Sequence, residues 1–190
     1  MSEQFHVDQE FRAQQFEDAH LKGAEFENCL FQSCHFIDKV FYKTVFINCE
    51  FVECDFSNAK LKTVAFRGAE FQNCKMIGLD FTSCNPFLLE LEFDQCALDY
   101  CLFGNLEIAN TAFKHCRLID TDFTKTDLSG AIFTGSNLSG AHFEKTLLIN
   151  ADFREAVSFN IDPEINNLRN AKFEKEQLDG LLQKYALDII

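Results

Sequence analysis

Nine cysteines and five histidines are the residues of this chain whose side chains could hold a metal ion or take part in redox and acid–base chemistry. Several cysteines are five residues apart, as Cys29 and Cys34 are. Zinc ligands also follow one another closely along a chain, but both thiolates must converge on one ion. The histidines stand without a local acid or base partner. Whether the thiols converge therefore depends on the backbone that carries them.

That backbone has a period of five residues. A large apolar residue occupies every fifth position from Phe11 to Phe81, and again, two residues out of phase, from Phe93 to Phe153. An α-helix repeats its face about every 3.6 residues and a strand every 2, so neither element explains this spacing. A fixed internal repeat is typical of a solenoid, in which each unit buries its apolar side chain by stacking on its neighbours.

The other positions of the unit predict a corner. Two residues before the large apolar residue the side chain is small, as at Ala24 and Cys29, and two residues after it Gly, Asn or Asp is frequent, as at Gly23 and Asn28. Gly, Asn and Asp tolerate the positive φ that a tight turn requires. Each unit is therefore an extended piece followed by a corner, and four units make a square coil of 20 residues.

All nine cysteines fall on the small, inward position of this unit. Residues that are five apart then lie on different sides of the coil, whereas residues that are 20 apart stack with parallel Cβ directions, which does not suit a disulfide. We expect free, buried thiols that fill the core. The sequence predicts no catalytic residue, no metal site and no cofactor, and hence a protein that is not an enzyme.

The composition limits the partners. The net charge is −13, with 30 acidic and 17 basic residues, which argues against a nucleic-acid partner and for a basic protein surface. No stretch approaches the roughly 20 apolar residues of a membrane span, and the N-terminus carries no signal peptide. We therefore expect no membrane association and a cytoplasmic location.

The last residues predict a different element. In FEKEQLDGLLQKYALDII, residues 173–190, apolar side chains at 178, 181, 182 and 185 follow the spacing of one helix face. A solenoid needs a cover over its open end, so we expect a short α-helical cap. Leu187 and Ile189 extend the apolar surface beyond that helix.

The repeat resembles the pentapeptide repeat family, whose consensus is A-(D/N)-L-X-X, most closely in TDLSGAIFTGSNLSGAHF, residues 126–143. The resemblance implies an all-β fold, a right-handed quadrilateral β-helix with the short C-terminal α-helical cap. It divides the chain into an N-terminal cap at 1–10, a β-helix at 11–158 in two runs with a slip at 82–92, and last repeats with a capping and dimerisation segment at 159–190.

The C-terminal segment, with NIDPEINNLRNAKF before the cap, resembles the topoisomerase-protecting members of that family, the Qnr, MfpA and microcin B immunity group. This resemblance implies a homodimer joined through the C-terminal segment. It also implies a DNA mimic that binds a type II topoisomerase, DNA gyrase or topoisomerase IV, and protects it against quinolones or gyrase-poisoning toxins.

The residues that would form these contacts follow from the resemblance. The expected dimer interface comprises Phe173, Leu178, Leu181, Leu182, Tyr185, Leu187 and Ile189. The expected acidic binding surface comprises Glu25, Glu27, Glu50, Glu53, Asp55, Glu70, Asp80, Glu90, Asp120, Asp122 and Asp127. The Qnr proteins project loops that matter for protection, while this chain has only the slip with Pro86 and Glu90. The alternative is a structural or adaptor β-helix that binds another protein and has no topoisomerase activity.

Overall fold

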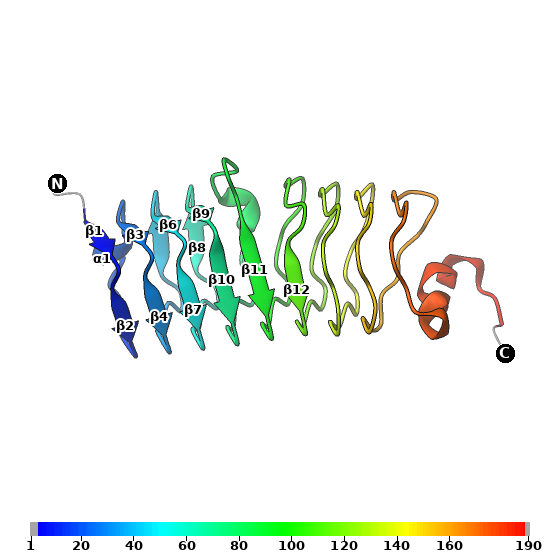
Figure 1. The fold of residues 1–190 in the computed structure, drawn as a ribbon, viewed down its shortest axis with the longest axis horizontal. Helices are drawn as coiled ribbons and strands as arrows, with labels where there is room; N and C mark the ends of the chain where they lie inside the picture. Colours follow the sequence, from blue (N-terminus) through cyan, green and yellow to red (C-terminus); the bar gives the residue numbers. More distant parts are fainter. Residues whose placement is uncertain (1–3, 189–190) are drawn as a thin grey trace.

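The computed structural model describes residues 4–188, which form a straight rod of stacked coils with a helical segment at its C-terminal end (Figure 1). One four-stranded parallel sheet has the order β1 (Phe5–Val7), β3 (Glu25–Glu27), β6 (Val45–Ile47) and β9 (Ala65–Arg67). A six-stranded parallel sheet runs β12 (Ala112–Lys114), β11 (Leu91–Asp94), β10 (Ala69–Gln72), β7 (Glu50–Val52), β4 (Leu30–Gln32) and β2 (Glu10–Arg12). A third, two-stranded sheet joins β5 (Val40–Tyr42) and β8 (Lys60–Lys62).

Strands that pair are 20 residues apart, so one coil is four units of five residues. Phe31 pairs with Phe51, for example, and Phe26 with Phe46. The predicted right-handed quadrilateral β-helix is confirmed. The strand β1 lies within residues 1–10, the expected N-terminal cap, and pairs with β3, so residues 5–7 continue the coil.

We name the four sides of the rod by the inward residues that stack on them. Side A carries Phe11, Phe31, Phe51, Phe71, Phe93, Phe113, Phe133, Phe153 and Phe173; side B begins with Phe16, Phe36, Phe56 and Met76; side C with Leu21, Phe41, Leu61 and Phe81; and side D with His6, Phe26, Phe46 and Phe66. Sides A and C are opposite each other, as are sides B and D.

The corners have the predicted backbone. The residue two after each inward residue has a positive φ throughout most of the chain, including non-glycine residues such as Asn28, Asp38 and Asn48. In the first half of the rod many corners continue directly from three-residue strands. In the second half most corners are closed four-residue turns. The backbone N–H of the fourth residue donates to the carbonyl of the first, as Thr126 N–H does to the Phe123 carbonyl.

Phenylalanine rings fill the core. On side A successive rings stack with centroids between 4.8 and 5.3 Å apart. In the second half Phe103 of side C meets Phe113 of side A edge to face at 5.6 Å, which is a favourable geometry for aromatic rings. His6 replaces a phenylalanine at the N-terminal end of side D and stacks on Phe26 at 4.8 Å.

The slip between the two runs is a two-residue insertion in one coil. Phe71 of β10 pairs with Phe93 of β11, 22 residues later. The 3₁₀ helix η1 (Phe81–Ser83) precedes the inserted loop, which projects from the rod near β11 (Figure 1). At the loop tip Phe87 and Leu88 are 65% and 55% exposed, and Leu88 has a φ of 56°, which is uncommon for a bulky residue.

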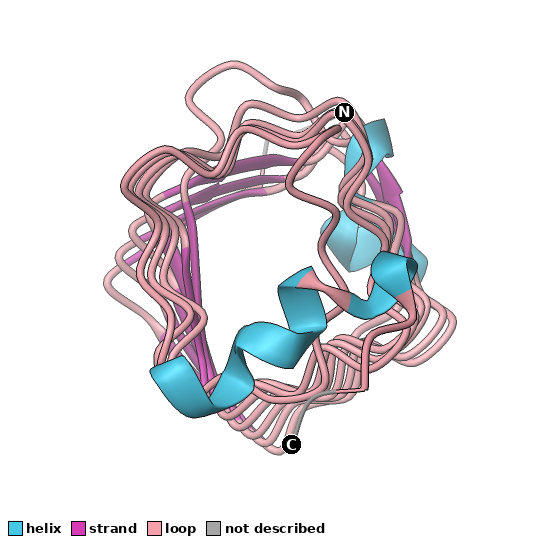
Figure 2. Cartoon of the chain, turned by 90° about the vertical axis from the view of Figure 1, so that its right-hand side faces the viewer, coloured by secondary structure: helices cyan, strands magenta, loops and turns pink. Residues whose placement is uncertain are grey.

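The C-terminal cap is helical but not α-helical, which corrects the sequence prediction. It consists of the 3₁₀ helices η2 (Lys175–Leu181) and η3 (Gln183–Tyr185), and Figure 2 shows it lying across the end of the rod. Gly180 allows the cap to pack closely on the end of the rod. Its carbonyl accepts a hydrogen bond from Ile161 N–H, and an added Cβ would lie 2.5 Å from Phe159. The one α-helix among the described residues is a short turn at the other end, α1 (Asp18–Leu21), which the sequence did not predict.

Candidate partner-binding surface

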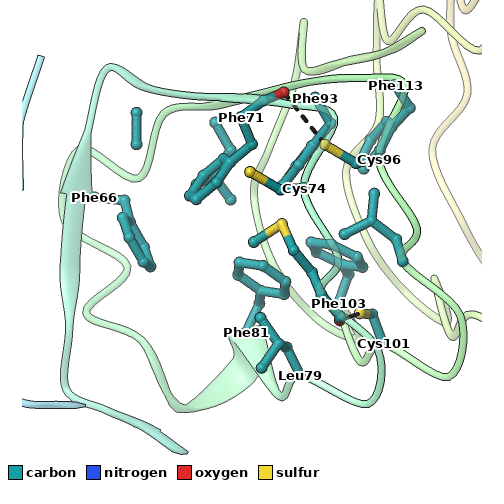
Figure 3. Packing of buried hydrophobic residues seen from close by; sticks show 14 of the residues in the cluster. Phe66, Phe71, Cys74, Leu79, Phe81, Phe93, Cys96, Cys101, Phe103 and Phe113 are labelled. Atoms are coloured by element: carbon teal, nitrogen blue, oxygen red, sulfur yellow. Dashed lines mark hydrogen bonds between the residues drawn. The ribbon is translucent and has the colours of Figure 1, made fainter. Parts of the chain in front are cut away.

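The inward thiols are hydrogen-bond donors as well as core filler. Cys54 donates its thiol to the carbonyl of Phe31 in the preceding coil, at 3.3 Å. Cys96 makes the same bond to Phe71 across the slip, also at 3.3 Å, as Figure 3 shows. Where the inward residue is Thr121 or Ser136 its hydroxyl donates in the same way, at 2.9 and 2.8 Å. The position therefore accepts either a small apolar residue such as Ala24 or a small hydrogen-bond donor, a role that the sequence interpretation missed.

All nine cysteines are free and buried. Burial raises the pKa of Cys49 and that of Cys101 to about 12, so these thiols are neutral near pH 7. Among residues 4–188, no group of three or more His, Cys, Asp or Glu side chains is placed to hold a metal ion. Nor is any helix of that segment long and apolar enough to cross a membrane.

The predicted acidic residues all lie outside the buried core, but they divide into two kinds. Four of the five predicted aspartates are used locally: Asp122 and Asp127 each accept a hydrogen bond from the backbone N–H two residues later. Asp80 accepts from Thr82 and Ser83 at the start of η1. Burial opposes ionisation of Asp55, but hydrogen bonds from Ser57 and the nearby Lys75 lower its pKa. These four carboxylates support the coil.

The glutamates are mostly available to a partner. Glu50 and Glu70 are exposed, lie in register on β7 and β10 of side A, and have no ion-pair partner among the described residues. Glu25 and Glu27 flank the buried Phe26 on side D and are half-buried. Of the remaining predicted acids, Glu53 accepts a bond from Ser33, whereas Glu90 and Asp120 are exposed, at the loop and at a corner.

Two further acids extend the side-A column, and the sequence prediction missed them. Glu92 of β11 is in register with Glu70, and Asp94 follows it on the same strand and contacts His115 at 3.2 Å. We call Glu50, Glu70 and Glu92 the glutamate column. Two of its members, Glu70 and Glu92, line two shallow hollows of about 290 and 230 Å³, the larger of which also includes Leu89 and Glu90 at the end of the inserted loop. The signal was present in the repeat, but the two-residue insertion hid the register.

The predicted dimer residues are only partly available. The Phe173 ring stacks on Phe153 at 5.0 Å as the last ring of side A, and Leu181 also packs against the core. Leu178, Tyr185 and Leu187 are 39%, 47% and 58% exposed, and Leu182 is half-buried. Ile189 lies outside the described residues.

The cap that presents these residues is tied to the rod by a polar cluster. Lys184 contacts Asp162 and Glu164, both at 2.6 Å, and Tyr185 donates its hydroxyl to Glu164 at 2.7 Å. The cap is therefore attached to the last coil by charged groups as well as by Leu181.

The comparison with known proteins agrees with this geometry. The sequence model of a family described as "pentapeptide repeat region" matches residues 19–103 and 106–182 of the chain. The chain therefore belongs to the pentapeptide repeat family. No relative is found among the curated proteins.

A solved structure shares the architecture. A trypsin-treated form of QnrB1, a plasmid-mediated fluoroquinolone resistance protein, is 18% identical, with 99% of this chain and 98% of that chain covered and a TM-score of 0.64. At that identity the likeness establishes the fold. HetL from Nostoc sp. strain PCC 7120, a pentapeptide repeat protein involved in heterocyst differentiation regulation, is 14% identical, with 88% and 84% covered and a TM-score of only 0.30.

Proposed function

We propose that this protein is a cytoplasmic DNA mimic that binds a type II topoisomerase, DNA gyrase or topoisomerase IV, and protects it against quinolones or gyrase-poisoning toxins. The observation that carries the proposal is the glutamate column, three exposed carboxylates in register on a rigid rod with no cation paired to them in the described segment. The fold similarity to QnrB1, which is named as a fluoroquinolone resistance protein, supports the same choice.

The arrangement of charge fits a basic groove in sign and shape. The carboxylates of the glutamate column repeat with the coil, about 4.8 Å apart, whereas duplex DNA carries one charge per roughly 1.7 Å. The column is thus less dense than DNA along its axis, and the net charge of −13 is shared with the other sides. The affinity of this protein for a basic groove should therefore fall as salt is added, but less steeply than the affinity of DNA for the same groove.

The C-terminal cap supports the homodimer. Leu178, Tyr185 and Leu187 are exposed in the C-terminal segment, whose helices lie across the end of the rod (Figure 2), where a second copy would continue the solenoid axis. Burying such side chains stabilises association by about 25 cal/mol per Å² of apolar surface before the entropic cost of association is subtracted. A two-fold dimer through the caps would double the length of the rod.

The test is a gyrase supercoiling assay with the purified protein titrated in, with and without a quinolone, at two salt concentrations. We expect restored supercoiling in the presence of the drug, or salt-sensitive inhibition in its absence. Unchanged supercoiling and unchanged drug sensitivity at an excess of protein would refute the proposal.

The surface is tested with a matched pair of variants. Glu70→Lys with Glu92→Lys reverses two charges of the glutamate column, and Glu144→Lys with Glu155→Lys makes the same charge change at exposed positions in the second half. We expect the first variant to lose most of the effect on gyrase and the second to keep it. Equal losses would mean that only net charge matters.

The alternative is an adaptor that binds another protein, and the exposed pair Phe87 and Leu88 at the loop tip favours it. Exposed apolar side chains of this kind are frequent in protein interfaces. An adaptor held by this pair would bind in high salt and would lose its partner on Phe87→Ser with Leu88→Ser, while a DNA mimic would be released by salt. A pull-down at low and high salt separates the two functions.

A further inference from the structure

A second charged surface, opposite in sign to the first, lies on side C near the N-terminal end. Its exposed cations are Lys22, Lys43, Lys60 and Lys62, and the same side presents Tyr42, which is 39% exposed. We call these five residues the lysine patch. Across the part of the chain that the structure describes, none of the four lysines forms an ion pair. In a chain with a net charge of −13, four unpaired cations on one side are a local reversal of the overall charge.

The coil geometry holds the patch in a fixed arrangement. Strands β5 and β8 pair so that Tyr42 lies opposite Lys62 and Val40 opposite Lys60. Gly23, which follows Lys22, donates its N–H to the carbonyl of Tyr42, so the preceding coil is in register as well. Lys22, Tyr42 and Lys62 therefore form one column, with a step of about 4.8 Å per coil.

The Tyr42 ring organises the ammonium groups. Lys22 Nζ lies 5.6 Å and Lys43 Nζ 5.5 Å from the ring centroid, both over the ring. Cation–π contacts of this kind hold a flexible lysine near one position. Beside the ring is an open hollow of about 390 Å³ lined by Asp18, Ala19, Lys22, Val40, Tyr42 and Lys62. Its lining combines the apolar side chains of Ala19 and Val40 with two lysines and a single carboxylate.

We infer that the lysine patch is a second interaction surface and that it binds a short acidic protein segment carrying at least one apolar side chain. The lysines would pair with carboxylates of that segment, and the hollow beside Tyr42 would take its apolar side chain. The inference does not depend on the proposed action on a topoisomerase, because it concerns the side opposite to the glutamate column.

Two observations favour an acidic peptide over a nucleic acid. Binding of a single strand relies on bases stacking on free aromatic faces, but Lys22 and Lys43 already lie over the Tyr42 ring. The patch also spans only the coils from Lys22 to Lys62, and the same coils carry the exposed acids Glu17 and Asp38 outside the hollow. A longer polyanion would meet those carboxylates, whereas a short segment would not.

The experiment measures binding of three labelled probes to the full chain by fluorescence anisotropy at 50 mM and 300 mM salt. The probes are an eight-residue peptide of alternating Glu and Leu, an eight-nucleotide oligothymidylate, and inorganic polyphosphate. The variants are Lys60→Glu with Lys62→Glu, and the matched control Lys125→Glu with Lys145→Glu, which makes the same charge change at exposed positions in the second half of side C. Thermal unfolding establishes that both variants are folded.

We expect the peptide to bind more tightly than the other two probes and to weaken at the higher salt. It should bind about tenfold more weakly to the Lys60 and Lys62 variant, because that variant removes two exposed ion pairs and replaces them by like-charge repulsion. The control variant should bind the peptide like the unaltered protein. Equal loss in both variants would reduce the effect to net charge and overturn the inference. Tighter binding of either phosphate probe, or no binding of the peptide, would also overturn it.

Discussion

The stacking of corners makes a quantitative prediction about two glycines of the same column. Gly78 and Gly140 both follow side-B residues by two positions and have φ values of +74° and +69°. A Cβ added at Gly78 would lie 3.6 Å from the Asn58 side chain, an ordinary contact. At Gly140 an added Cβ would overlap the carboxylate of Asp120 in the preceding coil and lie 3.1 Å from its Cγ. The two positions therefore have the same backbone conformation, but only Gly78 has room for a side-chain methyl group.

The expected costs follow from this difference. An alanine in the left-handed region costs roughly 1–2 kcal/mol, and the stiffer unfolded chain returns about 0.4–1 kcal/mol, so Gly78→Ala should destabilise by about 1 kcal/mol. Gly140→Ala must in addition move Asp120 out of its preferred rotamer, which costs about 1 kcal/mol more. For a domain of this size 1 kcal/mol lowers the Tm by roughly 2–4 °C.

Urea and thermal unfolding of the two variants measure these costs, and Asp120→Ala provides the control. In the Asp120→Ala background the carboxylate is gone, so Gly140→Ala should cost no more than Gly78→Ala. Equal destabilisation by the two glycine substitutions in the native background would refute the steric argument. So would an excess cost at Gly140 that persists without the Asp120 carboxylate.

Three further predictions concern the core, the thiols and the cap. Phe113→Ala removes a ring stacked on both neighbours of side A and should destabilise the protein by about 3–5 kcal/mol in urea unfolding. Burial raises the pKa of the Cys101 thiol from 9.0 to about 12, so the stability that this buried neutral thiol contributes is present below pH 9 and is lost as the pH rises towards 12. Cys101→Thr keeps a hydrogen-bond donor but does not ionise in this range, so it should reduce the fall in Tm between pH 8 and 10.5. Lys184→Met removes the contacts to Asp162 and Glu164, and hydrogen exchange should become faster in residues 175–188 while the Tm changes little.

Much of the fold is written in the sequence because the repeat is local and regular. The five-residue spacing from Phe11 to Phe81 fixes which side chains point inward, and the same unit places Asn28 and Gly23 at corners with positive φ. Each coil contacts only its neighbours, so a rule that holds for one unit holds for the stack. The buried, unpaired state of all nine cysteines followed from the same phase.

The features that the sequence did not determine are those that depend on contacts between coils. The register of Glu92 with Glu70 depends on how the two-residue insertion is absorbed, which only the pairing of β10 with β11 decides. The cap is a 3₁₀ helix in which Gly180 packs against Phe159, a contact that helical periodicity does not encode. The 20-residue coil already places Lys22, Tyr42 and Lys62 in one column, but only the structure shows the Lys22 and Lys43 ammonium groups over the Tyr42 ring and the hollow beside it. Sequence spacing thus determined the coil, while the stacking of coils decided which charges share a surface.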